Sequence, residues 1–192
     1  MKATGIVRRI DELGRVVIPK EIRRTLRIRE GDALEIYTDR EGGVILRKYS
    51  LVGELGDFSK EYAESLHQAI GHIAVICDKD AIVACSSSSR RDYAAGQPLA
   101  PGKPISDELD GVIAARKTVI REASKGDEMF SVAKADDGQS QYTAQLIAPI
   151  IAAGDPIGAV ILLAKEKSAC FSQADIKVAE TAASFLGRQM AN

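Results

Sequence analysis

The first fifty residues constrain the fold most, because they alternate strand-like and helical segments in a stretch too short to bury a core of its own. β-Rich runs at 4–10 and 14–18 flank a turn-forming sequence, a short helix is expected at 20–26, and a hairpin is expected from 33–38 and 44–49. Domains of this size usually need a disulfide, a metal or a partner chain. Neither cysteine nor histidine occurs in the segment. We therefore expect two copies of the chain to fold together here.

Positive charge is concentrated in the same segment, although the whole chain has a formal net charge of −1. Residues 1–29 carry nine basic and three acidic side chains, a net charge of +6, and residues 1–50 have a net charge of +4. Residues 51–192 carry fourteen basic and nineteen acidic side chains, a net charge of −5. This asymmetry favours a nucleic-acid partner for the N-terminal part alone.

The expected helix after Pro19 separates its apolar and basic side chains. At about 100° per residue, Ile22 and Leu26 lie on one face and the basic residues lie on the other. An ordinary solvated face is the alternative, but no acid is interleaved there. Guanidinium groups suit phosphates and guanine edges because they donate two parallel hydrogen bonds. Charge geometry alone selects four residues for DNA contact: Lys2, Arg9, Lys20 and Arg27.

The sequence TGIVRRIDELGRVVIP, followed by EIRRTL, resembles the swapped-hairpin domain of AbrB-type transition-state regulators. The resemblance covers about the first quarter of the chain. It implies that two chains exchange hairpins to form one dimeric β-barrel that binds double-stranded DNA. The positions that match the DNA-contacting arginines of that family are Arg8, Arg15, Arg23 and Arg24.

We expect a domain boundary near residue 52, with a DNA-binding domain at 1–52 and a second domain at 53–192. Turn signals and periodicity in the second part predict an α+β domain with an antiparallel sheet and flanking helices. The helices are expected at 55–70, 106–116 and 172–190, and the strands at 73–78, 81–85, 118–121, 129–134, 142–151 and 157–164.

The first and last of these helices carry apolar side chains at steps of three and four residues. Such narrow stripes predict that the two helices pack together and against the same pair in another chain. We therefore expect the N-terminal homodimer to assemble into a homotetramer through the C-terminal helices. The residues assigned to oligomerisation are Leu55, Phe58, Tyr62, Leu66, Ile176, Ala179, Ala183, Leu186 and Met190.

The order of elements in residues 53–192 is similar to that of GAF domains, which bind small molecules or sense signals. The segments API and PIGAV, followed by Phe171 and Ser172, carry most of the resemblance. It implies a small-molecule effector for this domain. Loops 86–89 and 96–104 are candidates for the rim of a pocket. Arg90 and Arg91 are candidates for anion binding, and a plain solvated loop is the alternative.

Other chemistry is weakly supported by the sequence. His67 and His72 are five residues apart, a spacing that does not place them on one helical face for a metal. Neither a Gly-x-Ser-x-Gly elbow nor a Gly-Lys-Ser/Thr phosphate loop is present. Three unclustered cysteines predict buried free thiols. We expect no enzyme activity, no metal, no cofactor and no membrane segment, and the apolar-poor start predicts a cytoplasmic protein.

Three functions fit these features. The first is a transcriptional regulator, activator or repressor, similar to the sporulation regulators of endospore-forming bacteria, in which the second domain sets the oligomeric state and answers a signal. The second is an antitoxin-like interaction module, since related swapped-hairpin domains neutralise toxins. Such proteins usually end in a flexible acidic tail, whereas residues 53–192 show regular apolar periodicity. The third is a metabolite sensor whose DNA binding is secondary.

Overall fold

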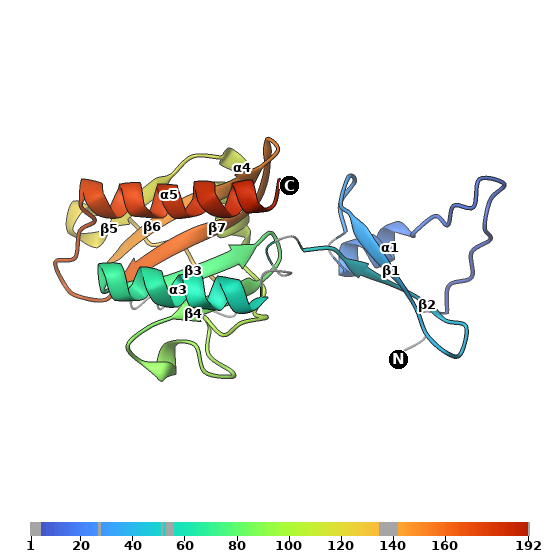
Figure 1. Cartoon of the computed structure of the whole chain (residues 1–192), viewed down its shortest axis with the longest axis horizontal. Coiled ribbons are helices and arrows are strands. Elements are labelled where there is room, and N and C mark those ends of the chain that lie inside the picture. Colours follow the sequence, from blue (N-terminus) through green and yellow to red (C-terminus); the bar gives the residue numbers. More distant parts are fainter. Residues whose placement is uncertain (1–4, 27, 51, 53–55, 135–141, 192) are drawn as a thin grey trace. The chain divides into compact units, whose positions relative to one another are not determined.

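Contacts within the chain gather into two compact units, Met1–Tyr49 and Ser50–Asn192, in a computed structural model (Figure 1). The described residues are 5–26, 28–50, 52, 56–134 and 142–191. Among them, no helix is at once long enough and apolar enough to cross a membrane.

The N-terminal unit contains helix α1 (Lys20–Thr25) and a hairpin of strands β1 (Leu34–Thr38) and β2 (Val44–Lys48). The two strands are antiparallel. Asp39 closes their turn, because its Oδ1 accepts hydrogen bonds from the backbone N–H of Glu41 at 3.0 Å and of Gly43 at 2.6 Å. The expected helix and hairpin are therefore present, with α1 beginning directly after Pro19.

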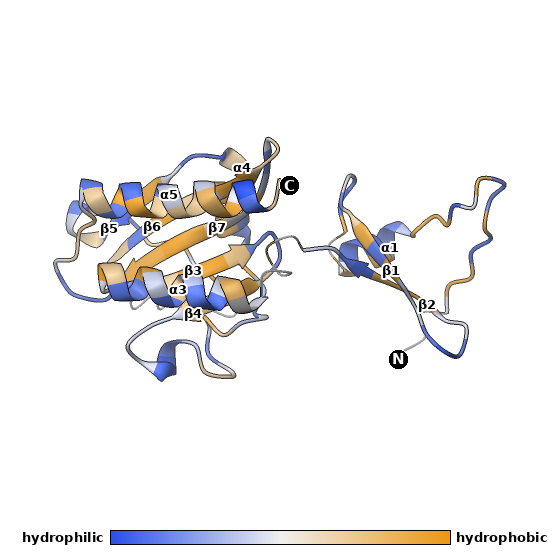
Figure 2. Ribbon diagram, viewed as in Figure 1, coloured by the Kyte–Doolittle hydropathy of each residue, from blue (hydrophilic) through white to orange (hydrophobic). Residues whose placement is uncertain are grey.

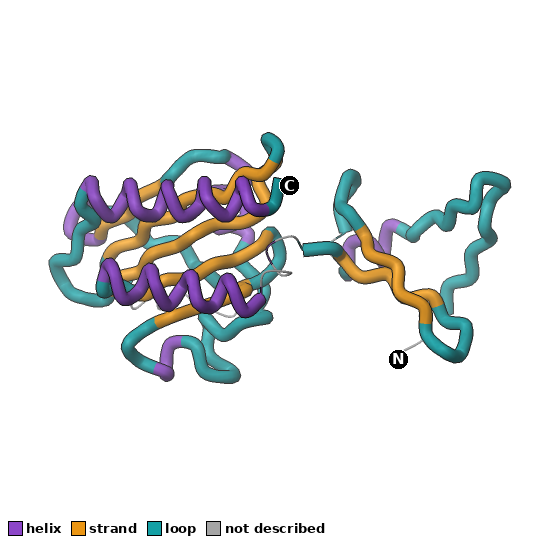
Figure 3. Tube along the Cα trace, viewed as in Figure 1, coloured by secondary structure: helices purple, strands orange, loops and turns teal. Residues whose placement is uncertain are grey.

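Residues 5–18 form a loop instead of the two strands expected at 4–10 and 14–18 (Figure 3). The tip of this loop is closed by a hydrogen bond, which the N–H of Asp11 donates to the carbonyl of Arg15 at 3.0 Å. An isolated pair of strands is at best marginally stable without further strands or a helix beneath it. The single chain offers the loop no such support, which explains why the expected strands are missing.

None of the described residues in the N-terminal unit is buried. The most exposed apolar side chains lie on the loop, with Val7 at 88% and Leu13 at 74% of their full accessible area. Figure 2 shows apolar and polar residues alternating along this loop without a covering element. Eleven large apolar side chains of the unit are exposed: Ile6, Val7, Ile10, Leu13, Val16, Val17, Leu26, Ile36, Tyr37, Val44 and Leu46.

The second unit is built around a five-stranded antiparallel sheet in the order β4-β3-β7-β6-β5. Its strands are β3 (Ile73–Asp78), β4 (Ile82–Ser86), β5 (Val119–Glu122), β6 (Ala144–Ala152) and β7 (Asp155–Ala164). Its helices are α3 (Gly56–Ile70), α4 (Asp107–Ala115) and α5 (Gln173–Gln189), with 3₁₀ turns η1 (Arg90–Asp92) and η2 (Ala123–Lys125).

Both faces of this sheet are covered. On β3, Ala74 and Ile76 belong to the core that includes α3 and α5, whereas Val75 and Cys77 belong to the core that includes α4. Alternation of this kind follows from the two-residue repeat of a strand. Because both faces are buried, the central strands are almost continuously apolar, which Figure 2 shows along β7. The result is a three-layer α+β domain.

The strand expected at 129–134 is absent, and the backbone of this segment is hydrogen-bonded to the side chain of Gln145 instead. The Gln145 amide donates to the carbonyl of Phe130 at 2.7 Å, and the Gln145 carbonyl oxygen accepts from the Phe130 N–H at 2.8 Å. A buried side chain therefore satisfies the backbone groups that a strand ladder would otherwise pair. The only strand-type pairing in the described part of this segment is the single bridge between Ile105 and Ala133.

The cysteines differ from the expectation in one respect. Cys77 and Cys85 are buried free thiols, but Cys170 is exposed. Burial raises the pKa of Cys77 well above its ordinary value and that of Cys85 to about 12, with Asp92 adding to the second shift. The two buried thiols are therefore inert packing groups at neutral pH.

Helix α5 is fixed at its start and near its end. Ser172 and Asp175 form a reciprocal capping box at its N-terminus. Near the other end, Gly187 touches β6 so closely that an added Cβ would lie 2.1 Å from the carbonyl oxygen of Ile151. Glycine is therefore required for α5 to lie flat on the sheet.

We expect Gly187→Ala to lower the free energy of unfolding by about 1–3 kcal/mol, because α5 must shift away from the backbone of Ile151. The control is Gly111→Ala in α4, where an added Cβ meets nothing within 4 Å. It should raise the free energy of unfolding by about 0.5–1 kcal/mol through helix propensity. Urea denaturation of both variants checks this prediction, and a loss of stability shared equally by the two would contradict it.

Candidate nucleic-acid interface

The turn at the tip of loop 5–18 is organised by Asp11. Its Oδ1 accepts hydrogen bonds from the N–H of Leu13 at 3.0 Å and of Arg15 at 2.8 Å, and its Oδ2 accepts from Nε of Arg15 at 2.8 Å. Gly14 completes the turn at a φ of +75°, which is unfavourable for other residues. The Arg15 N–H, then its guanidinium, lower the pKa of Asp11. Arg15 is thus held by a local ion pair.

The other predicted DNA-contacting residues in the described part of the chain have no acid partner. Their side chains are exposed, and none of them forms an ion pair with a described residue. These residues are Arg8, Arg9, Lys20, Arg23 and Arg24. Cations without partners are suited to exchange their counterions for phosphate groups. Lys2 and Arg27 lie outside the described residues.

The structure of one chain brings only some of these cations together. Lys20, Arg23 and Arg24 share helix α1, which has no buried residue. Arg8, Arg9 and Arg15 lie on loop 5–18, which leads away from α1 in Figure 1. The expected docking face of α1 is also uncovered, since Leu26 is exposed and Ile22 is only half-buried.

The residues assigned to oligomerisation divide between the core and the surface of the second unit. Those buried in the core of their own domain are Leu66, Ala179, Ala183 and Leu186. Tyr62, Ile176 and Met190 are half-buried, Phe58 is 38% exposed, and Leu55 lies outside the described residues. The main apolar stripe of α5 is therefore used to hold this helix on the sheet.

An aromatic cluster lies on the outer side of α3 and α5. The ring of Tyr62 stacks on Phe58 and on Phe185, with 5.7 Å between centroids in each pair, and Phe58 lies 6.2 Å from Phe185. Phe185 is 38% exposed, and Val178, seven residues earlier on α5, is exposed as well. We name Phe58, Tyr62, Val178 and Phe185 the outer helix face.

Sequence reasoning missed Phe185 and Val178. The signal was a second apolar stripe on α5, since residues seven apart lie on the same helical face. It runs beside the stripe that includes Ala183 and Leu186, which has more apolar residues and is buried in the core. The sequence contains both stripes, and only the fold decides which of them is covered by the sheet.

The whole chain matches a family of transcription factors. A family model described as "Stage V sporulation protein T C-terminal, transcription factor" matches residues 54–191. The stage V sporulation protein T of Bacillus subtilis (strain 168) is 51% identical over 190 residues, and the match covers 99% of each chain. These matches define the protein as a transcription factor. The chain belongs to the stage V sporulation protein T family.

The N-terminal unit has relatives of its own. The transition state regulatory protein AbrB of Bacillus subtilis (strain 168) is 60% identical over 63 residues, which cover 30% of this chain and 65% of that protein. A family model described as "Antidote-toxin recognition MazE, bacterial antitoxin" matches residues 7–53. The expected AbrB-type N-terminal domain is confirmed.

The second unit has the fold of a GAF domain. The crystal structure of the GAF domain from an Acinetobacter phosphoenolpyruvate-protein phosphotransferase superposes with a TM-score of 0.55. The two sequences are 15% identical, and the match covers 75% of this chain and 84% of that one. Identity at this level shows a common fold only, and the expected GAF-like α+β fold is confirmed.

The pKa of Asp11 provides a test of the turn. The pKa of Asp11 is lower in the folded turn than in the unfolded chain. The ionised carboxylate therefore stabilises the turn at pH values above the unfolded pKa, and this stabilisation is lost as the pH falls through the folded pKa. We expect Arg15→Ala to raise the pKa of Asp11 only part of the way, since the backbone N–H of residue 15 remains. Carboxyl ¹³C NMR titration measures it. Arg9→Ala is the control, and an unchanged pKa in Arg15→Ala would contradict the role of the guanidinium.

Proposed function

We propose that this transcription factor binds double-stranded DNA through residues 1–52, in a swapped-hairpin homodimer, and represses or activates sporulation genes without any catalytic step. Residues 53–192 form its sensory and oligomerisation domain. Its place of action is the cytoplasm of the developing spore, as the identity to the sporulation protein of Bacillus subtilis suggests.

The observation that carries the proposal is a set of exposed cations without acid partners, in a unit where none of the described side chains is buried. Folding of such a unit requires apolar contact with a second copy, and each Val, Leu or Ile that becomes buried contributes about 1.5–3 kcal/mol. A twofold dimer then displays every arginine twice. The contacts proposed for DNA are those of Arg8, Arg15, Arg23 and Arg24, with Lys2, Arg9, Lys20 and Arg27 added by charge.

The outer helix face is the surface proposed for tetramer formation. It presents aromatic rings that the domain's own core leaves partly exposed. Aromatic side chains are enriched in protein interfaces because they bury a large area with few rotatable bonds. A second copy meeting this face through its own α3 and α5 forms a four-helix contact.

A toxin-neutralising role is the second candidate, because the antitoxin family model matches residues 7–53. It ranks below transcription regulation, since the residues that follow form a folded domain of a transcription-factor family. Co-purification of a small toxin that displaces DNA from the N-terminal dimer would reverse this order.

The DNA-binding surface predicts a steep dependence on salt. If about six to ten phosphates are neutralised, affinity should fall by about 10³ to 10⁵ between 50 and 200 mM salt. Arg24→Ala removes two cations from a dimer and should reduce the slope of log K against log salt by about 2. Fluorescence anisotropy with a duplex selected by the wild-type protein from genomic fragments measures both.

The matched control for this experiment is Arg90→Ala, which removes an exposed arginine of the second unit. It should leave the slope unchanged. A flat salt response of the wild-type protein, or equal slopes for Arg24→Ala and wild type, would defeat the proposed interface. Circular dichroism should show that Arg24→Ala remains folded, since Arg24 is exposed.

The outer helix face predicts separable levels of assembly. We expect the double variant Phe58→Ala and Phe185→Ala to form dimers where the wild-type chain forms tetramers, because the aromatic contact between copies is lost. Sedimentation equilibrium measures the mass of each species. Lys60→Ala, on an exposed position of α3, should remain tetrameric. Tetramers of the double variant would show that assembly uses another surface.

A further inference from the structure

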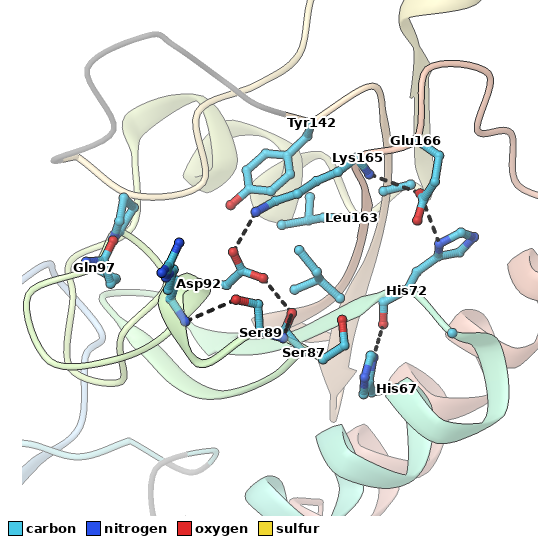
Figure 4. A pocket seen from close by; sticks show the side chains of 16 residues that line it. His67, His72, Ser87, Ser89, Asp92, Gln97, Tyr142, Leu163, Lys165 and Glu166 are labelled. Atoms are coloured by element: carbon cyan, nitrogen blue, oxygen red, sulfur yellow. Dashed lines mark hydrogen bonds and ion pairs between the residues drawn. The ribbon is translucent and has the colours of Figure 1, made fainter.

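A polar cavity of about 730 Å³ lies at one end of the GAF-like sheet (Figure 4). Three parts of the chain line it: residues 67–73 at the end of α3, residues 87–98 around η1, and residues 163–166 at the end of β7, together with Tyr142. Its volume falls within the range of roughly 300–1,000 Å³ that is usual for small-molecule sites. Most such sites are mainly apolar, whereas this lining is rich in charged and hydroxyl groups.

One wall of the cavity is held by a charge network. Lys165 Nζ lies 2.5 Å from Oδ1 of Asp92, and Oδ2 of Asp92 accepts a hydrogen bond from the Ser87 hydroxyl at 2.5 Å. The same Nζ lies 5.7 Å from the centroid of the Tyr142 ring. The side chain of Asp92 is only 9% exposed. Lys165 and Asp92 therefore neutralise each other and fix η1 against the end of β7.

Arg91, which precedes Asp92 in η1, contributes a positive charge that no acidic side chain among the described residues balances. It lines the cavity, and it forms no ion pair with any residue in the described part of the chain. Its backbone N–H donates to the Ser89 hydroxyl at 3.3 Å, which orders this turn. Ser88 and Gln97 add a hydroxyl and an amide to the same lining. A guanidinium beside such donors is suited to a carboxylate or a phosphate.

The opposite end of the cavity carries acceptors. Nδ1 of His67 lies 2.7 Å from the carbonyl oxygen of His72, and because a carbonyl only accepts, this nitrogen carries a proton. In the neutral ring Nε2 is therefore an acceptor. Glu166 adds a carboxylate, whose Oε2 lies 4.0 Å from Nδ1 of His72. Figure 4 shows His72 and Glu166 across the cavity from Asp92 and Gln97.

We propose that this cavity binds a small hydrophilic metabolite through a carboxylate or phosphate group held by Arg91, with a hydroxyl or ammonium group of the ligand directed toward Glu166. The inference rests on the sensory role proposed for the GAF-like domain and assigns that role a site and a ligand chemistry. Arg90, its neighbour in η1, does not line the cavity. The two arginines therefore form a matched pair for testing.

Titration of the full chain with four probes tests the site. Glycerol 3-phosphate, malate and inorganic phosphate carry the oxyanion, and glycerol is the neutral comparison at equal ionic strength. Isothermal titration calorimetry should give saturable binding of at least one organic anion, at least about tenfold tighter than glycerol, as expected for charge-assisted hydrogen bonds. Binding of glycerol 3-phosphate alone identifies a phosphate ligand, and binding of malate alone identifies a carboxylate.

The variants decide whether Arg91 is the anchor. Arg91→Ala should raise the Kd of the bound anion about tenfold or more, and Arg90→Ala should leave it within about twofold. Equal weakening by both variants, binding of glycerol as tight as that of the anions, or no saturable binding up to about 10 mM would overturn the proposal. DNA binding without any probe is measured on the same samples. If the chain binds DNA but no anion, only the cavity proposal is overturned. If it binds the anion but not DNA, only the proposed DNA interface is overturned.

Discussion

The exposure of apolar side chains in the N-terminal unit is the constraint on which the rest depends. Eleven large apolar residues there are exposed, and no described residue of the unit is buried. One chain gains almost none of the hydrophobic free energy that would offset the entropy of ordering loop 5–18. In the proposed dimer, folding of this loop and assembly of its arginines beside those of α1 are the same event. DNA affinity is then coupled to oligomerisation without any dedicated switch.

Helix α3 connects the two features of the second unit. Phe58 and Tyr62 belong to the outer helix face, and His67, near the C-terminal end of the same helix, lines the cavity. The inner side of α3 is fixed to the sheet through Ala63 and Leu66. A ligand in the cavity therefore touches an element that takes part in the proposed contact between copies, and a packed helix transmits displacement along its length.

Most helices and strands of the second unit were predictable from periodicity and turn residues. The segment 129–134 was not, because the Gln145 side chain replaces the expected ladder, and a single buried amide leaves no periodic signal. Exposure of Cys170 was likewise missed, since the apolar Phe171 beside it is buried. For the candidate site, the basic residues were predictable from charge, but the aromatic partner Phe185 was hidden beside the stronger stripe of α5.

The sequence by itself determined the separation of charge between the two parts, the small number of apolar residues that the first fifty residues can bury, and the main apolar stripes of α3 and α5. These follow from composition and from the repeat of 3.6 residues, which are local properties. Only the tertiary structure decided which stripe of α5 meets the sheet and that Arg91, rather than Arg90, lines the cavity. The reason is that covering a face, or enclosing a space, requires segments far apart in the chain, whose meeting no local pattern records.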